Sequence, residues 1–375
     1  MGKIRNNKYD QNSFMLKSII IFLLLTLSIL TFSEVVVQSQ IDDLESIIYS
    51  RSLRLESLFP EITVIRYDKP VAIEVKYMEQ IISRLTLDKA GDFTAEKIVS
   101  FFLNVEENLL IISSIKNTNS KKSTVVDVID AVYEYPFIDE NGEYLVYISD
   151  KMTGNRNPVI LNLMNHHERH VIIPESGDYF PLLFEDTLFF LMAVEDGFSI
   201  VSHDLSNGHY SELIRGDLTC LRSNHDFLYY SENNKVFQLN TSGHIINQFE
   251  FKYPIQSFDI AGNNLILSLL DGVQYDLFLF NIVGSKLIRL TDTEYNEVDV
   301  IFQNLTNAIF SSNKTGNYGI YQLNVSFVDS PSDYHLIYET KNKDIFYPCY
   351  SFVYSKIVSC VFETGKEPKF LIIPH

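Results

Sequence analysis

Short apolar runs recur along most of this chain, and each is followed by a turn rich in Gly, Asn and Asp. Examples are residues 145–148, 188–193, 227–231 and 265–270. They are too short for ordinary helices and rich in β-branched and aromatic residues, as expected of buried strands. Equivalent runs lie roughly 35 to 50 residues apart, the range typical of β-propeller blades. The repetition predicts an all-β fold of four-stranded sheets around one axis.

Two copies of the repeat are the clearest. One spans residues 136–155 and the other residues 300–323, and both run strand, polar turn, apolar strand, then Ser-(Asp/Asn)-Lys, Thr-Gly-Asn and a further strand. Asn141-Gly142 predicts a tight hairpin turn, because Gly and Asn accept positive φ at little cost. The polar segments 150–155 and 313–317 predict the next turn of each copy.

These copies resemble the β-propeller repeat of TolB-like proteins, which is related to WD40 blades. The best matching segments are 141–155 and 289–321, and the resemblance covers roughly residues 98–375. The Ser-Pro-Asp-Gly turn usual in that family is nowhere complete here. The resemblance implies a protein that acts through protein contacts. TolB also carries an α/β domain before its propeller, but residues 41–95 look too few to hold one.

The number of blades follows from where the repeats begin. Starts near residues 98, 136, 178, 217, 255, 295 and 345 favour seven blades, with six or eight left open. The last repeat lacks an outer strand because the chain stops at His375. Residues 61–66 or 71–77 are candidates to supply that strand and so remove an exposed sheet edge. We therefore expect the propeller domain to occupy residues 60–375.

The N-terminal region has the features of an export signal. Residues 18–33 contain an apolar run, preceded by the cations Lys3, Arg5, Lys8 and Lys17 and followed by acidic residues. This order predicts a signal peptide or signal anchor, with residues 1–17 as a cytoplasmic basic region. Residues 34–59 are expected to form a helical stalk or linker. The rest of the chain would be extracytoplasmic, in the periplasm or cell envelope, and membrane-anchored if the signal is not cleaved.

Charge and cysteine content restrict the partners and the chemistry. The formal net charge is −18, which argues against a nucleic-acid partner because no basic excess is available for phosphates. The three cysteines cannot form a disulfide framework. Cys349 and Cys360 could face each other across a hairpin, but at a hydrogen-bonded position a bridge would be strained, so buried free thiols are favoured.

Residues with the potential for chemistry are few. The cluster of His166, His167 and His170 lacks the helical HExxH spacing and is interpreted as a solvated turn. The Asp-Gly pairs at 196–197 and 271–272 are explained by turn chemistry rather than by calcium. We find no G-x-S-x-G elbow, P-loop or dinucleotide fingerprint. No catalytic, cofactor-binding or metal-ligating residue is therefore nominated, and no cofactor is expected.

These sequence features leave two possible functions. The favoured one is a non-enzymatic scaffold of the cell envelope that binds a protein partner or an envelope polymer through its propeller. The alternative is a hydrolase or lyase acting on an envelope glycan or peptide in the propeller channel. Carboxylates or histidines converging in the channel would favour the enzyme. Apolar or aromatic side chains around its mouth would favour a protein partner.

Overall fold

The structure is a computed structural model whose chain divides into two compact units. It describes residues 55, 61–66, 71–77, 80–87, 94–116, 122–126, 132–139, 141–151, 153–165, 167–172, 177–224, 226–326 and 333–375. One unit contains residues 1–112 and 164–168, and the other contains residues 113–163 and 169–375. The predicted export signal and almost all of the predicted stalk lie outside the described residues.

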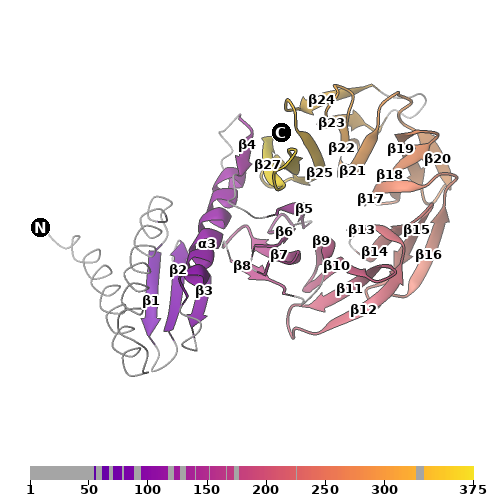
Figure 1. Cartoon of the computed structure of the whole chain (residues 1–375). Coiled ribbons are helices and arrows are strands. Elements are labelled where there is room, and N and C mark those ends of the chain that lie inside the picture. Colours follow the sequence, from indigo (N-terminus) through magenta and orange to yellow (C-terminus); the bar gives the residue numbers. More distant parts are fainter. Residues whose placement is uncertain are drawn as a thin grey trace, which may run out of the picture. The chain divides into compact units, whose positions relative to one another are not determined.

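Within the described residues, the second unit contains six four-stranded blades that fan around a common centre (Figure 1). Five blades are formed by four strands consecutive in sequence. The sixth combines the last three strands with an earlier one. The blades in order are β5 (Glu134–Ile138), β6 (Tyr144–Ser149), β7 (Asn157–Asn162) and β8 (Glu168–His170); β9 (Asp178–Phe184), β10 (Thr187–Val194), β11 (Gly197–Asp204) and β12 (Tyr210–Gly216); β13 (Leu218–Asn224), β14 (Phe227–Glu232), β15 (Lys235–Leu239) and β16 (Ile245–Glu250); β17 (Ile255–Ala261), β18 (Asn264–Asp271), β19 (Gln274–Asn281) and β20 (Lys286–Arg289); β21 (Glu297–Asn304), β22 (Asn307–Ser312), β23 (Gly319–Asn324) and β24 (Tyr334–Tyr338); and β25 (Asp344–Ser351), β26 (Lys356–Phe362), β27 (Lys369–Pro374) and β4 (Thr124–Val126).

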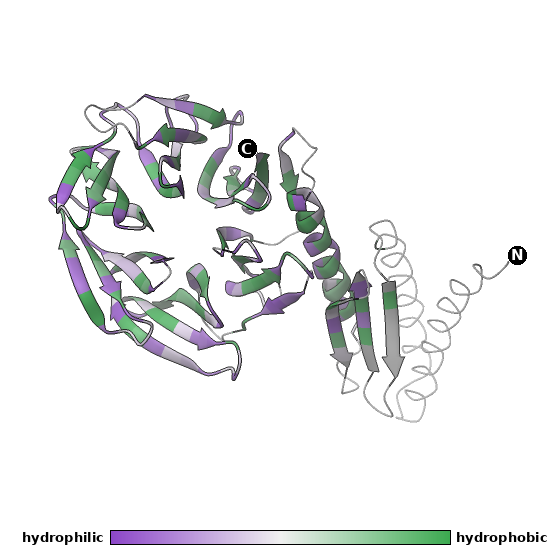
Figure 2. Ribbon diagram, turned by 180° about the vertical axis from the view of Figure 1, so that it is seen from behind, coloured by the Kyte–Doolittle hydropathy of each residue, from purple (hydrophilic) through white to green (hydrophobic). Residues whose placement is uncertain are grey.

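The burial of each strand follows from its place in the blade. The first strand of each blade lines the axis and is called the inner strand here: β5, β9, β13, β17, β21 and β25 (Figure 1). The second strands, such as β6 and β22, are almost wholly buried, because neighbouring blades cover both faces. The outer strands β12, β16 and β20 contain no buried residue and show many hydrophilic residues (Figure 2).

The apolar core lies largely between adjacent blades. One cluster joins Ile266 and Leu277 of blade 4 to Val300, Phe310 and Tyr321 of blade 5. A blade alone would leave both of these faces in water, so each blade needs its neighbours to fold. The predicted starts near 136, 178, 217, 255, 295 and 345 each fall within three residues of an observed inner strand. The all-β propeller prediction is confirmed.

The ring is closed by β4, and the segments predicted for this role were wrong. Val126, Val125 and Thr124 pair antiparallel with Phe370, Leu371 and Ile372 of β27. Residues 61–66 and 71–77 do form strands, but in another sheet. Closure by β4 gives the last blade its fourth strand and removes the free edge of β27.

The first predicted blade, starting near residue 98, is a helix instead. Residues 95–116 form α3 (Ala95–Lys116), so the propeller has six blades rather than the favoured seven. Ile98, Phe102, Val105, Leu109 and Ile112 are buried and follow each other at three- and four-residue intervals. That spacing is the period of a helix. The long apolar run at its end hid this period and was misread as a strand.

The first unit is a small α/β assembly that the sequence analysis did not expect. The strands β1 (Glu61–Arg66), β2 (Val71–Tyr77) and β3 (Gln80–Leu87) form an antiparallel sheet. Ile73, Val75 and Ile82 of this sheet share an apolar cluster with residues of α3. The blades therefore occupy residues 124–375, and the expected propeller boundary at residue 60 is corrected.

Among the described residues, α3 is the one helix long and apolar enough to cross a membrane. Within the molecule, 61% of its most apolar window is buried. Its buried side chains contribute to the apolar cluster of the first unit, as those of a core helix do.

Candidate functional site

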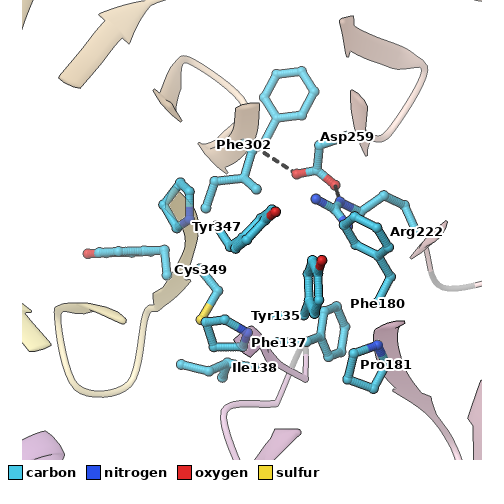
Figure 3. A pocket seen from close by; sticks show the side chains of 14 residues that line it. Tyr135, Phe137, Ile138, Phe180, Pro181, Arg222, Asp259, Phe302, Tyr347 and Cys349 are labelled. Atoms are coloured by element: carbon cyan, nitrogen blue, oxygen red, sulfur yellow. Dashed lines mark hydrogen bonds and ion pairs between the residues drawn. The ribbon is translucent and has the colours of Figure 1, made fainter. Parts of the chain in front are cut away.

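All six inner strands carry a β-bulge at an equivalent place. The pairing of each inner strand with the second strand of its blade shifts register there. Four residues at these bulges have positive φ: Tyr135, Phe180, Asp299 and Tyr347, with values between 48° and 54°. A bulge re-aims side chains out of the regular alternation of a strand. Three of these side chains, Tyr135, Phe180 and Tyr347, line a pocket on the propeller axis (Figure 3).

An aromatic wall lines one half of the axis. Tyr347, Tyr135 and Phe180 come from the neighbouring blades 6, 1 and 2. The Tyr135 ring centroid lies 4.5 Å from that of Phe180 and 4.5 Å from that of Tyr347. Each of the three aromatic residues is followed by a proline. Proline is tolerated here because it sits at a bulge of an edge strand, where no ladder donor is needed.

A polar wall from blades 3 and 4 lines the other half through Arg222 and Asp259, and Asp299 of blade 5 lies outside the pocket lining. Arg222 Nε lies 3.7 Å from Asp259 Oδ1, and Arg222 also donates to the Leu221 carbonyl at 2.9 Å. Asp299 accepts hydrogen bonds from the Gln256 side chain at 2.8 Å and from the Tyr347 backbone N–H at 3.2 Å. In Figure 3 the hydroxyls of Tyr135 and Tyr347 point toward Arg222 and Asp259, so the two walls meet through polar groups.

The space between the walls is a small axial pocket of about 120 Å³. Its lining runs from the bulges toward the ends of the inner strands, at Ile138, Phe302 and Tyr350. Sites for drug-sized ligands usually measure about 300 Å³ or more. This pocket therefore suits a few water molecules or one inserted side chain better than a whole cofactor.

Burial dominates the electrostatics of the pocket. Burial raises the pKa of Asp259 and Asp299, although the nearby Arg222 and hydrogen bonds to each carboxyl oppose the rise. Burial also raises the pKa of Tyr347, and the charge of Asp299 and the Tyr135 ring beside it add to this. For Arg222, burial alone would lower the pKa, but the negative groups around it raise it overall. Arg222 thus keeps its positive charge beside Asp259.

The pocket thiol is poorly suited to nucleophilic chemistry. Cys349 is buried, and burial raises its pKa, so the neutral thiol prevails at neutral pH. Cys220, Cys349 and Cys360 are all free, as expected. Cys349 pairs with Val358 rather than with Cys360, because the hairpin turn between β25 and β26 spans residues 352–355 and sets that register. The predicted facing pair therefore does not form.

The pocket lies near the turns that follow the inner strands, which we call the inner turns. Three large apolar side chains project from the inner turns of blades 5 and 6. Leu305, Phe352 and Val353 have exposed fractions of 68%, 63% and 58%. Val353 packs close to Gly142 of the blade 1 inner turn, where an added Cβ would lie 2.5 Å from its side chain. This apolar group, called the apolar arc, therefore reaches the edge of blade 1.

The residues singled out in the sequence do not converge on the pocket. His167 lies exposed in a turn and His170 ends β8, while His166 lies outside the described residues. No group of three possible metal ligands occurs among the described residues. The Asp-Gly pairs at 196–197 and 271–272 form turns between strands, as expected. Sequence reasoning missed the pocket residues, although the aromatic–Pro pairs at 135–136, 180–181 and 347–348 were a usable signal.

Comparison with known proteins gives matches to solved structures only: no family model matches, and no curated protein does. TolB from Acinetobacter baumannii has a TM-score of 0.43 at 10% identity, over 84% of this chain and 79% of that one. The fold resembles that of TolB. The six blades confirm the propeller fold that the resemblance to TolB-like proteins implies.

Propellers of peptidases give matches of the same kind. The β-propeller domain of the Trilobed protease from Pyrococcus furiosus has a TM-score of 0.46 at 14% identity, over 64% of this chain and 92% of that domain. That domain is described as having an open velcro topology, whereas β4 pairs with β27 here. A solved structure from a study of two prolyl endopeptidases has a TM-score of 0.45 at 9% identity, over 71% of this chain and 43% of the matched chain. A fold of this kind does not by itself assign a function.

Proposed function

We propose that this chain is an extracytoplasmic scaffold of the cell envelope that binds a protein partner on the face of the propeller formed by the inner turns. The apolar arc carries this proposal. Soluble proteins rarely gather large exposed apolar side chains without a partner to cover them. Leu305, Phe352 and Val353 lie on the turns of two neighbouring blades, beside the mouth of the axial pocket.

The axial pocket supports binding better than catalysis. Its carboxyl group is already engaged, because Asp259 pairs with Arg222 and accepts a hydrogen bond from the Phe302 backbone N–H. The Cys349 thiol is held in its neutral form by burial. A hydrolase or lyase would need a base and an activated nucleophile or water within hydrogen-bond reach of a substrate. The pocket instead offers space for one side chain of a partner docked on the inner turns.

Site-specific photo-crosslinking in intact cells tests the binding face. A photoreactive phenylalanine analogue replaces Phe352 in one variant and Val273 in a control. Val273 is 83% exposed and lies in the turn between β18 and β19, at the opposite end of its blade. We expect a discrete protein adduct from position 352 and none from position 273. No adduct from position 352, together with turnover of an envelope glycan or peptide by the pure protein, would establish the enzymatic alternative instead.

Export is proposed on the charge and hydropathy of residues 1–33. A reporter that is active only in an oxidising compartment is fused after residue 60. We expect activity with the native N-terminal segment and none when residues 18–33 are deleted. Activity of a reporter that functions only in the cytoplasm would contradict the proposed location.

A further inference from the structure

The inner turns differ sharply in charge from one side of the propeller to the other. Among the described residues of the inner turns, those of blades 1, 2 and 3 carry acidic side chains and neither Lys nor Arg. Those of blades 4, 5 and 6 carry no charged side chain in the segments 262–263, 305–306 and 352–355. We call the first group the acidic arc; its members are Asp139, Glu143, Glu185, Asp186 and Asp226.

Four of the five acidic residues are exposed to solvent. Glu143, Glu185, Asp186 and Asp226 are exposed, and Asp139 is half-buried because its carboxylate caps the turn by accepting from the Tyr144 backbone N–H at 2.6 Å. A hydrogen bond within the turn thus explains why an acidic residue stands at position 139, but gives no such reason for the other four acidic residues. The inner turns therefore present free negative charge on three consecutive blades and apolar side chains on two others.

All six inner turns lie at the same end of the propeller, because each follows an inner strand and the inner strands surround one axis. The acidic arc and the apolar arc adjoin where Val353 of blade 6 packs against Gly142 of blade 1. A docked chain segment long enough to cross the mouth of the pocket would touch both arcs.

We infer that the partner segment bound on this face combines Lys or Arg side chains with large apolar side chains, the cations on the acidic arc and the apolar groups on the apolar arc. The inference rests on the proposed function and adds the chemistry of the partner. Complementary charges at the rim of an interface accelerate encounter and select the orientation of docking. Apolar side chains buried beside them supply most of the affinity. A neutral glycan would use the acidic arc poorly, and an anionic polymer would be repelled by it.

The test uses the full-length chain in a non-ionic detergent and three fluorescent nine-residue peptides. The probe peptide contains Lys and Leu in equal numbers, separated by Gly. A second peptide has Glu in place of Lys, and a third has Ser in place of Leu. Fluorescence anisotropy gives the Kd, and detergent without protein gives the background for each peptide.

Matched charge variants separate a local effect from the general acidity of the chain. The arc variant neutralises three exposed acids, and the control variant neutralises three exposed acids at the opposite end of the blades. The two sets of substitutions remove the same number of negative charges from opposite ends of the blades. The substitutions are Glu185→Gln, Asp186→Asn and Asp226→Asn in the arc variant, and Glu195→Gln, Asp196→Asn and Glu294→Gln in the control.

We expect the Lys/Leu peptide to bind, and its Kd to rise roughly tenfold in the arc variant, as the loss of three exposed ion pairs implies. The control variant should stay within about twofold, and added salt should weaken wild-type binding more than binding to the arc variant. Equal weakening in both variants, or equal binding of the Glu/Leu peptide, would overturn the inference.

The crosslinking experiment separates this inference from the proposed function. The yield of the adduct at position 352 is compared in the arc and control variants. An adduct that persists unchanged in the arc variant leaves the binding face in place and refutes its preference for a basic segment. Loss of the adduct in the arc variant but not in the control variant supports both the binding face and its preference for a basic segment. No adduct in any variant refutes the proposed binding face itself.

Discussion

Glu297 is a fully buried carboxyl at the start of an inner strand. Its side chain is 0% exposed and accepts hydrogen bonds from Tyr334 and Thr293 at 2.7 Å each and from Thr291 at 3.1 Å. Burial raises its pKa to about 7, more than these donors lower it. The nearby Asp276 carboxyl adds to the rise. The pKa of Glu297 thus lies near neutrality because its side chain is buried.

This raised pKa predicts a pH-dependent stability. Between pH 4.5 and 7 the folded protein keeps a proton on Glu297 that the unfolded chain has lost. The contribution of the neutral carboxyl is therefore complete below pH 4.5 and is lost as the pH rises through 7. In Glu297→Gln this position does not titrate. Between pH 5 and pH 8.5, we expect the free energy of unfolding of the wild type to fall by about 2 kcal/mol more than that of the variant.

Urea denaturation of both proteins at the two pH values measures this change. Comparing the variant with wild type cancels the titration of the other buried carboxyls. Two stability curves that run parallel from pH 5 to pH 8.5 would show that Glu297 is already ionised at pH 5.

The strand β4 has a large role for its size. It has three residues, yet it is the only described strand that joins the last blade to a segment preceding the first. Val126 is 0% exposed, whereas its neighbour Val125 is 42% exposed on the other face. Alternate residues of a strand face opposite sides, so the two valines differ in burial while sharing the same backbone pairing.

This contrast gives a matched pair of substitutions. Val126→Asp places a carboxylate in an apolar space, and we expect it to lower the free energy of unfolding by about 3 kcal/mol or more. Val125→Asp introduces the same side chain on the exposed face and should cost less than about 1 kcal/mol. Thermal melts followed by circular dichroism compare the two variants. Similar losses for both would mean that β4 contributes by its backbone pairing alone.

The whole molecule consists of two units with separate cores. The apolar cluster around Ile73, Phe102 and Val105 belongs to the first unit, and the clusters between the blades belong to the second. Every strand of the six blades lies within residues 124–375, including the closing strand. The propeller should therefore fold without the N-terminal 121 residues, provided that β4 is kept.

Two fragments test the need for ring closure. Residues 122–375 contain all the blade strands, and residues 132–375 lack β4. We expect the longer fragment to be a monomer that melts cooperatively. The shorter one leaves the edge of β27 unpaired and should associate or melt at a lower temperature. Size-exclusion chromatography with light scattering distinguishes them. A shorter fragment that is equally stable and monomeric would show that the ring does not need β4.

The blade strands could be predicted from the sequence because the information is local. The run at 145–148 and the turn at Asn141-Gly142 each follow from the identity of a few adjacent residues, and β6 and the turn before it are found as predicted. The same reasoning gave a wrong prediction for residues 95–116. Their helical period was present, but a run of apolar residues at 109–112 fits a buried strand or a buried helix equally well, and only packing in the first unit distinguishes the two.

The sequence alone determined that this chain forms repeated, buried strands separated by tight turns, since side-chain size, branching and positive-φ turn residues act over a few positions. Tertiary structure decided how the ring closes and what lies on its axis. Val126 meets Phe370, and Arg222 meets Asp259, only when segments far apart in the sequence come together. Their pairing depends on the blade number and on bulges that redirect single side chains, and neither leaves a periodic trace in the sequence.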